Sequence, residues 1–242
     1  MIMNGSNTIA QPKYKDTSQL DAVTSDVYGF PLRQDERSGM FIQINNIGDQ
    51  RISIRNSVTF GWHIYMVTLN LIFFVHWTRD GQERTGCYNL QCPGYVPEPN
   101  KPTVPGIAID AVSDPDGVKR TIIFKVFKDS AGDWLMRIGF DSRPYLIGRF
   151  PKSLFTSLGD KADNVRLGGF VATRTTQLAP MGSGFLPDNA KSASLSNIQL
   201  IDQNGKTSKL DRDQPADMND RNIYSVSPIS VEGKFTYSGP LK

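Results

Sequence analysis

Few residues in this chain could do chemistry on their own. Both cysteines lie in one stretch, Cys87 and Cys92, with four residues between them, and the two histidines are His63 and His76. Two such thiols can pair in an oxidising compartment, and two cysteines with two histidines can bind zinc. However, His63 alternates away from the apolar side of its predicted strand, and no paired ligand spacing supports a metal site. We therefore expect a loop whose thiols can form a disulfide, with no metal and no cofactor.

Length and composition are typical of one β-rich domain. The chain has 242 residues, of which 38% are hydrophobic and 10% aromatic, and its 21 glycines and 15 prolines indicate many turns. The formal net charge is +3, but acidic and basic residues are interspersed rather than gathered in runs. No apolar stretch approaches the ~20 residues that span a bilayer. We therefore expect neither a nucleic-acid nor a membrane partner.

The elements that must position these residues are short strands. Residues 58–64 alternate strictly between apolar and polar types, and residues 71–77 are more continuously apolar, which predicts burial on both faces. Residues 120–128 and 134–140 flank a turn and are typical of a hairpin. Residues 151–158, with proline near the first turn, form the one predicted helix. At least ten short strands predict an all-β fold, an antiparallel two-sheet β-sandwich with one short helix.

The N-terminal part differs in character from the rest. Residues 1–38 are polar and show little periodicity, which predicts a loosely ordered arm, and residues 39–242 form the predicted β-sandwich domain. The first residues also lack the basic and apolar regions of a secretory signal.

One block of sequence carries a family resemblance. It reads Trp-Thr-Arg-Asp-Gly at 77–81 and Thr-Gly-Cys-Tyr-Asn-Leu-Gln-Cys-Pro-Gly-Tyr-Val at 85–96, with Gly-Trp-His-Ile at 61–64, Leu-Gly-Gly at 167–169 and Met-Gly-Ser-Gly at 181–184 in matching order. The chain resembles the neprosin family, plant proteins whose active members are similar to glutamic-type, proline-directed endopeptidases. The resemblance implies a β-sandwich with a groove across one sheet, and an exported, extracellular protein.

The resemblance also implies two catalytic glutamates. One carboxylate activates water and a second acid donates a proton, so the two need unequal pKa values. The family places one glutamate two residues before the Gly-Trp pair and the other directly after the Gly-Gly pair. These positions hold Thr59 and Phe170, neither of which can exchange a proton at a useful pH. We therefore expect a catalytically inactive homologue; the alternative is an active prolyl endopeptidase that uses other carboxylates.

Four further residues are candidates for the groove: Trp62, Trp77, Gly182 and Ser183. The tryptophans could stack on a ligand, although at strand positions tryptophan is more often a core residue. Gly182 and Ser183 could form a groove wall that a peptide approaches closely, or a simple loop. The expected partner of such a groove is a proline-rich peptide or a glycan.

Overall fold

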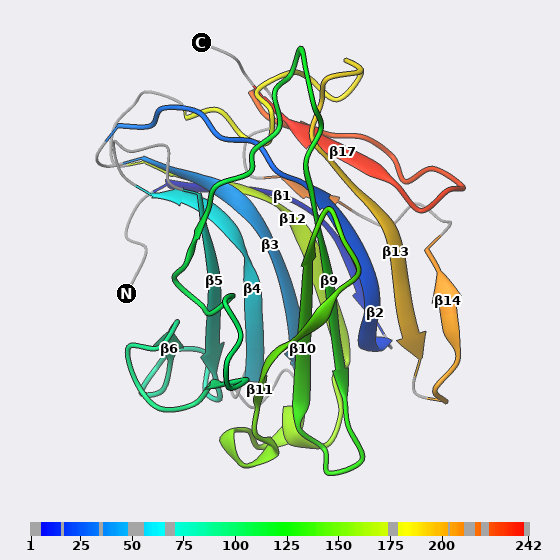
Figure 1. The fold of residues 1–242 in the computed structure, drawn as a ribbon. Helices are drawn as coiled ribbons and strands as arrows, with labels where there is room; N and C mark the ends of the chain where they lie inside the picture. Colours follow the sequence, from blue (N-terminus) through cyan, green and yellow to red (C-terminus); the bar gives the residue numbers. More distant parts are fainter. Residues whose placement is uncertain are drawn as a thin grey trace.

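The computed structural model describes residues 6–15, 17–33, 36–47, 56–65, 71–173, 179–202, 204–210, 216–218 and 223–239. Two curved sheets face each other in this part of the chain (Figure 1). Every described strand pair in both sheets is antiparallel, so the predicted two-sheet, all-β architecture is confirmed. No helix in the described residues is long and apolar enough to cross a membrane.

The first sheet has eight strands. Their order is β15-β1-β12-β3-β4-β5-β6, and β8 also pairs with β5. The strands are β1 (Ser6–Lys15), β3 (Arg37–Asn46), β4 (Asn56–Tyr65), β5 (Leu71–Thr78), β6 (Cys87–Tyr88), β8 (Ala108–Ile109), β12 (Asn164–Thr173) and β15 (Ala216–Met218).

The second sheet has nine strands. Their order is β16-β17-β13-β2-β9-β10-β11-β7, with β14 paired to β13. The strands are β2 (Thr17–Asp26), β7 (Val96–Pro97), β9 (Thr121–Lys128), β10 (Trp134–Phe140), β11 (Tyr145–Phe150), β13 (Ser194–Asp202), β14 (Thr207–Lys209), β16 (Ser225–Val226) and β17 (Phe235–Ser238). The predicted hairpin is present as β9 and β10.

The core lies between the sheets and is built by strand alternation. On β4, the apolar residues Phe60 and Trp62 are fully buried, whereas Thr59 between the apolar positions is only partly buried. The ring of Phe60 contacts that of Phe124 on β9, with centroids 5.6 Å apart, so this contact joins the two sheets. Successive side chains on a strand point to opposite faces, and therefore Thr59 faces away from the core.

The N-terminal segment corrects the expectation of a loose arm. Strand β1 lies between β15 and β12 in the first sheet, and β2 lies between β13 and β9 in the second. Leu20 and Val23 of β2 are fully buried. The register between β2 and β9 shifts between these two residues, which is a bulge or a similar irregularity. Such a shift breaks the period-2 pattern by which a strand is recognised.

The predicted helix is a pair of 3-10 turns, η1 (Lys152–Leu154) and η2 (Ser157–Gly159). Phe155 between them is extended, with φ −114° and ψ 157°, which interrupts helical geometry. The carbonyl oxygen of the Asn56 side chain accepts hydrogen bonds from the backbone N–H of Thr156 at 2.8 Å and of Leu158 at 3.4 Å. A side chain from β4 thus satisfies backbone donors that a continuous helix would bond internally.

Candidate functional site

The two family positions lie on the same face of the first sheet, with strand β3 between them. Thr59 on β4 pairs with Gln43 on β3, and Phe170 on β12 pairs with Gly39 on the other side of β3. We call this surface the first outer face; its side chains come from Phe41, Gln43, Thr59, His63, Phe74, His76, Tyr88, Arg166 and Phe170.

Around Thr59 the first outer face is a network of neutral amides and one guanidinium. The Nε2 group of Gln43 donates to the Thr59 hydroxyl oxygen at 3.0 Å. The Oε1 atom of Gln43 accepts from Asn45 Nδ2 at 3.3 Å and from Arg166 Nη1 at 3.4 Å. Asn45 Nδ2 also donates to Asn164 Oδ1 at 3.2 Å. None of these groups can act as a general acid or base near neutral pH.

Around Phe170 the same face is a closed aromatic cluster. The Phe170 ring makes edge contacts with Phe41 and Phe74, with centroids 6.2 Å and 6.3 Å apart. The three residues are only 7%, 8% and 6% exposed, respectively. Aromatic pairs in this geometry add stabilisation beyond the apolar area that they bury. The position at which the family resemblance expects the second acid is therefore occupied by a ring packed among others.

A histidine and a tyrosine border the aromatic cluster. Nε2 of His63 lies 2.5 Å from the Tyr88 hydroxyl, and the Tyr88 ring is stacked on Phe74 with centroids 6.1 Å apart. Burial lowers the pKa of His63 to about 4, and the charge of Arg37 acts in the same direction. At neutral pH the imidazole is therefore neutral and bonded to the phenol.

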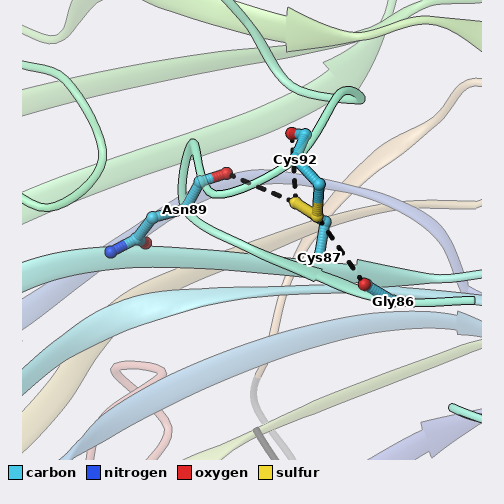
Figure 2. Close-up of a disulfide and its surroundings, with 4 residues drawn as sticks. All are labelled: Gly86, Cys87, Asn89 and Cys92. Atoms are coloured by element: carbon cyan, nitrogen blue, oxygen red, sulfur yellow. Dashed lines mark hydrogen bonds between the residues drawn. A yellow bond between two sulfur atoms is a disulfide. The ribbon is translucent and has the colours of Figure 1, made fainter.

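Tyr88 lies in the loop closed by the predicted disulfide. Cys87 and Cys92 are bonded, with Cα atoms 5.8 Å apart, which confirms the expected pairing. Figure 2 shows the carbonyl oxygens of Gly86 and Asn89 turned toward the two sulfurs. A disulfide sulfur carries no proton, so these are close contacts and not hydrogen bonds. The Asn89 side-chain oxygen accepts from the backbone N–H of Val75 at 2.9 Å and anchors the loop to β5.

The second histidine lies on the first outer face beside the other family position. His76 on β5 pairs with Thr59, and burial lowers its pKa to about 4. Among the described residues, no group of three or more histidine, cysteine or acidic side chains could hold a metal ion.

Acidic residues are scarce in the first sheet. The sequences of β1, β3, β4, β5, β6, β8 and β12 contain no aspartate or glutamate. Asp217, on β15 at the sheet edge, is the one acidic residue in these eight strands. Strand β1 separates β15 from β12, so Asp217 lies two strands away from the strand that carries Phe170.

The candidate groove tryptophans lie on the core side of the first sheet. Trp62 is fully buried, and its Nε1 donates to Ser25 Oγ at 3.1 Å. The Trp77 ring makes an edge contact with Phe155, with centroids 6.2 Å apart, and packs against the core. Strand alternation places both rings on the face opposite Thr59. Trp62 and Trp77 are therefore core residues and do not line the first outer face.

Gly182 and Ser183 form a buried turn rather than a wall of the first outer face. Ser183 Oγ accepts a hydrogen bond from the backbone N–H of Ala193 at 3.1 Å, and Ser183 is 4% exposed. Gly182 has φ +65°, and a Cβ there would lie 2.6 Å from the carbonyl oxygen of Tyr237. Glycine is required because the turn packs tightly against β17.

Sequence reasoning missed most residues that surround the two family positions. Gln43 and Phe41 could have been found from the alternation of β3, which places both on the polar side of the strand. Tyr88 and Arg166 reach the same face from distant segments, and only strand pairing brings them together.

Comparisons with known proteins agree with this architecture. The Neprosin family profile matches residues 34–240. A crystal structure of scytalido-glutamic peptidase with a peptide-based transition-state analogue superposes with a TM-score of 0.51 at 9% identity, covering 99% of this chain and 100% of that one. A second structure of that peptidase with a transition-state analogue inhibitor gives 0.51 at 7% identity and the same coverage. At such low identity the likeness concerns the fold alone. Because the family profile covers most of its length, the chain belongs to the neprosin family.

Proposed function

We propose that this chain is a non-catalytic member of the neprosin family that binds an extended peptide without hydrolysing it. What supports the proposal is the nature of the two positions to which the family resemblance assigns acids: Thr59 is a hydrogen-bonded hydroxyl, and Phe170 is a phenyl ring packed among two others.

The chemistry of a glutamic peptidase explains why these replacements matter. A water molecule attacks the peptide carbonyl only if a carboxylate removes its proton, and the leaving amine needs an acid of higher pKa. Gln43 beside Thr59 is a neutral amide. His63 is neutral, buried and bonded to Tyr88. His76 beside Thr59 is neutral as well. Strands β3, β4, β5 and β12 carry no carboxylate, so the pair of acids that the family chemistry uses for the two proton transfers is missing around these positions.

The aromatic character of the face supports a proline-rich ligand. Grooves that bind proline-rich segments are lined by aromatic rings, because the extended proline helix is preformed and presents flat apolar faces. Tyr88 is the partly exposed member of the ring cluster. The scytalido-glutamic peptidase structure contains a peptide-based analogue, and a related fold here supports a peptide over a glycan.

A cleavage assay tests the catalytic half of the proposal. The folded protein is incubated with a proline-containing peptide at acidic and neutral pH, and the products are identified by mass spectrometry. We expect an intact peptide. Cleavage after proline that resists serine- and metallo-protease inhibitors would establish the active alternative. A second experiment restores both acids with Thr59→Glu and Phe170→Glu, in a preparation shown to be folded. Peptidase activity that appears only in this double variant would identify residues 59 and 170 as the positions of the two family acids.

A titration tests the binding half. A proline-rich peptide and an alanine peptide of equal length and charge are titrated into the protein by calorimetry. We expect binding of the proline-rich peptide alone, weakened by Tyr88→Ala but not by Tyr145→Ala, which removes a tyrosine from β11 in the other sheet. Equal affinity for both peptides, or a stronger response to a neutral oligosaccharide, would contradict the proposal.

A further inference from the structure

The outer side of the second sheet contains a pocket that the family chemistry does not use. It has a volume of about 620 Å³, and its lining residues come mainly from β2, β9 and β10. These three strands are neighbours in the second sheet (Figure 1). Its lining includes Asp21, Lys125, Phe127, Arg137, Arg143 and Pro144. The volume falls within the range of small-molecule sites, roughly 300–1,000 Å³.

The pocket is far more basic than the chain as a whole. Its lining contains two lysines and two arginines, Lys125, Lys128, Arg137 and Arg143, against the single carboxylate of Asp21. The whole chain has 27 basic and 24 acidic residues. Lys125 and Lys128 lie on β9, Arg137 on β10 and Arg143 in the loop after β10, and the fold brings these three segments together. Such an excess of one sign in a concave site attracts anions.

Three of the four cations have capacity left for a ligand. Lys128 is committed, because its Nζ donates to the carbonyl oxygens of Gly159 and Asp160 at 2.5 Å and 2.8 Å. Lys125 makes only a loose ion pair with Asp21, at 3.6 Å between nitrogen and oxygen.

The two arginines are the strongest candidates. Within the described part of the chain, neither arginine makes an ion pair, and Arg143 has no hydrogen-bond acceptor. Nε of Arg137 is buried, so a ligand would meet the terminal nitrogens of this guanidinium. The guanidinium of Arg137 lies 5.8 Å from the centre of the Phe127 ring, within the range of a cation–π contact. A fixed guanidinium binds a carboxylate through two parallel hydrogen bonds.

We propose that this pocket is a binding site for an acidic oligosaccharide, a short chain of carboxylate-bearing sugars. Each sugar ring of such a chain carries one carboxylate, so successive charges can meet Lys125 and Arg137, which are paired across neighbouring strands, and Arg143 from the following loop. Phe127 and Pro144 supply apolar surface for the ring faces. A single phosphate would need its donors around one compact centre, whereas the cations here are spread over two strands and the loop that follows them.

The test uses the full chain and tri-galacturonate as the probe, with neutral galactotriose, inorganic phosphate and a short polyglutamate as comparison ligands, measured by calorimetry. We expect tri-galacturonate to bind, to weaken as salt is added, and to bind more tightly than the other three. Arg137→Gln and Arg143→Gln should each weaken binding about tenfold or more, because each removes a charge-assisted pair.

Arg84→Gln is the matched control, since it removes one exposed arginine from the turn beyond β5; we expect it to bind like the parent chain. Thermal unfolding checks that every variant is folded. Arg143 lies on a loop, so we expect its substitution to leave the sheet intact. The proposal is overturned if tri-galacturonate does not bind, if phosphate or polyglutamate binds equally well, or if both pocket variants bind like the control.

Discussion

The outer surfaces of the two sheets are used in opposite ways. On the first outer face, the polar groups around Thr59 bond to one another and the rings around Phe170 pack together. On the second sheet, Arg143 makes no ion pair in the described chain, and Nε of Arg137 is buried without an acceptor. On the first surface most of these side chains pack or bond among themselves, and Tyr88 is the partly exposed ring; the second surface keeps charged groups available. The surface that carries the family positions is therefore not the surface with the most unpaired charge.

The largest expected difference comes from placing an acid on each surface. Phe170→Glu removes a packed ring and introduces a carboxylate among Phe41 and Phe74, so we expect a loss of at least about 4 kcal/mol in the free energy of unfolding. Phe127→Glu lies in the pocket beside Arg137, with which it can pair, and should cost less than about 2 kcal/mol. Urea unfolding measures both. Equal losses of unfolding free energy in the two variants would show that the two surfaces do not differ in how tightly their side chains are packed.

His63 on the first outer face makes stability depend on pH. Its pKa is lowered from 6.5 to about 4 in the folded state, chiefly by burial. The unfolded chain therefore binds more protons in this window, so stability is full above pH ~6.5 and falls as pH drops toward ~4, by about 3 kcal/mol at most. His76 acts in the same direction.

His63→Gln isolates this contribution. We expect the variant to lose less stability than the parent chain between neutral and acidic pH, as measured by urea midpoints at each pH. The carboxylates on the rest of the surface titrate equally in both proteins, so they cancel in the difference. Parallel curves for the two proteins would show that His63 becomes protonated without cost.

Breaking the disulfide should have a smaller effect. Cys87→Ser with Cys92→Ser opens a short loop, and the chain-entropy account gives a loss of about 2 kcal/mol. Because the loop contains Tyr88, the contact with His63 should loosen as well, which the chemical shift of the imidazole would report. An unchanged unfolding midpoint together with an unchanged imidazole signal would mean that Asn89 holds the loop alone.

The smallest effect is expected in the pocket. Arg143→Gln should change the free energy of unfolding by less than about 0.5 kcal/mol, since no described group depends on its charge. A loss comparable with that of the disulfide variant would show that Arg143 is a structural residue. The second surface would then not differ from the first in having unpaired charged groups.

Local pattern predicted much of the fold. The alternation of β4 placed Thr59 opposite Phe60 and Trp62, and the structure confirms this arrangement. The continuous apolar character of β5 correctly indicated burial on both faces, since Phe73 and Phe74 are both buried. These predictions succeeded because each depends only on the period of one strand.

Features that depend on pairing or on irregular backbone could not be predicted. The register shift between Leu20 and Val23 hid β2, since the two buried residues do not follow one period. Lys125, Arg137 and Arg143 do not form a charge run, and only the β9–β10 pairing brings the first two together. Trp62 and Trp77, the candidates for the groove, lie on the core side instead, as the alternation of their strands and the usual place of tryptophan already indicated.

The two strands formed by residues 6–15 and 17–26 have a practical consequence for anyone who produces this protein. The family match begins at residue 34, and an expression boundary chosen there would delete β1 and β2 from the interiors of their sheets. Each deletion separates two strands that had been joined through the missing one, so β12, β15, β9 and β13 would all expose unpaired backbone. Open edges of this kind promote aggregation, and a fragment trimmed to the family limits should therefore be recovered mainly in inclusion bodies.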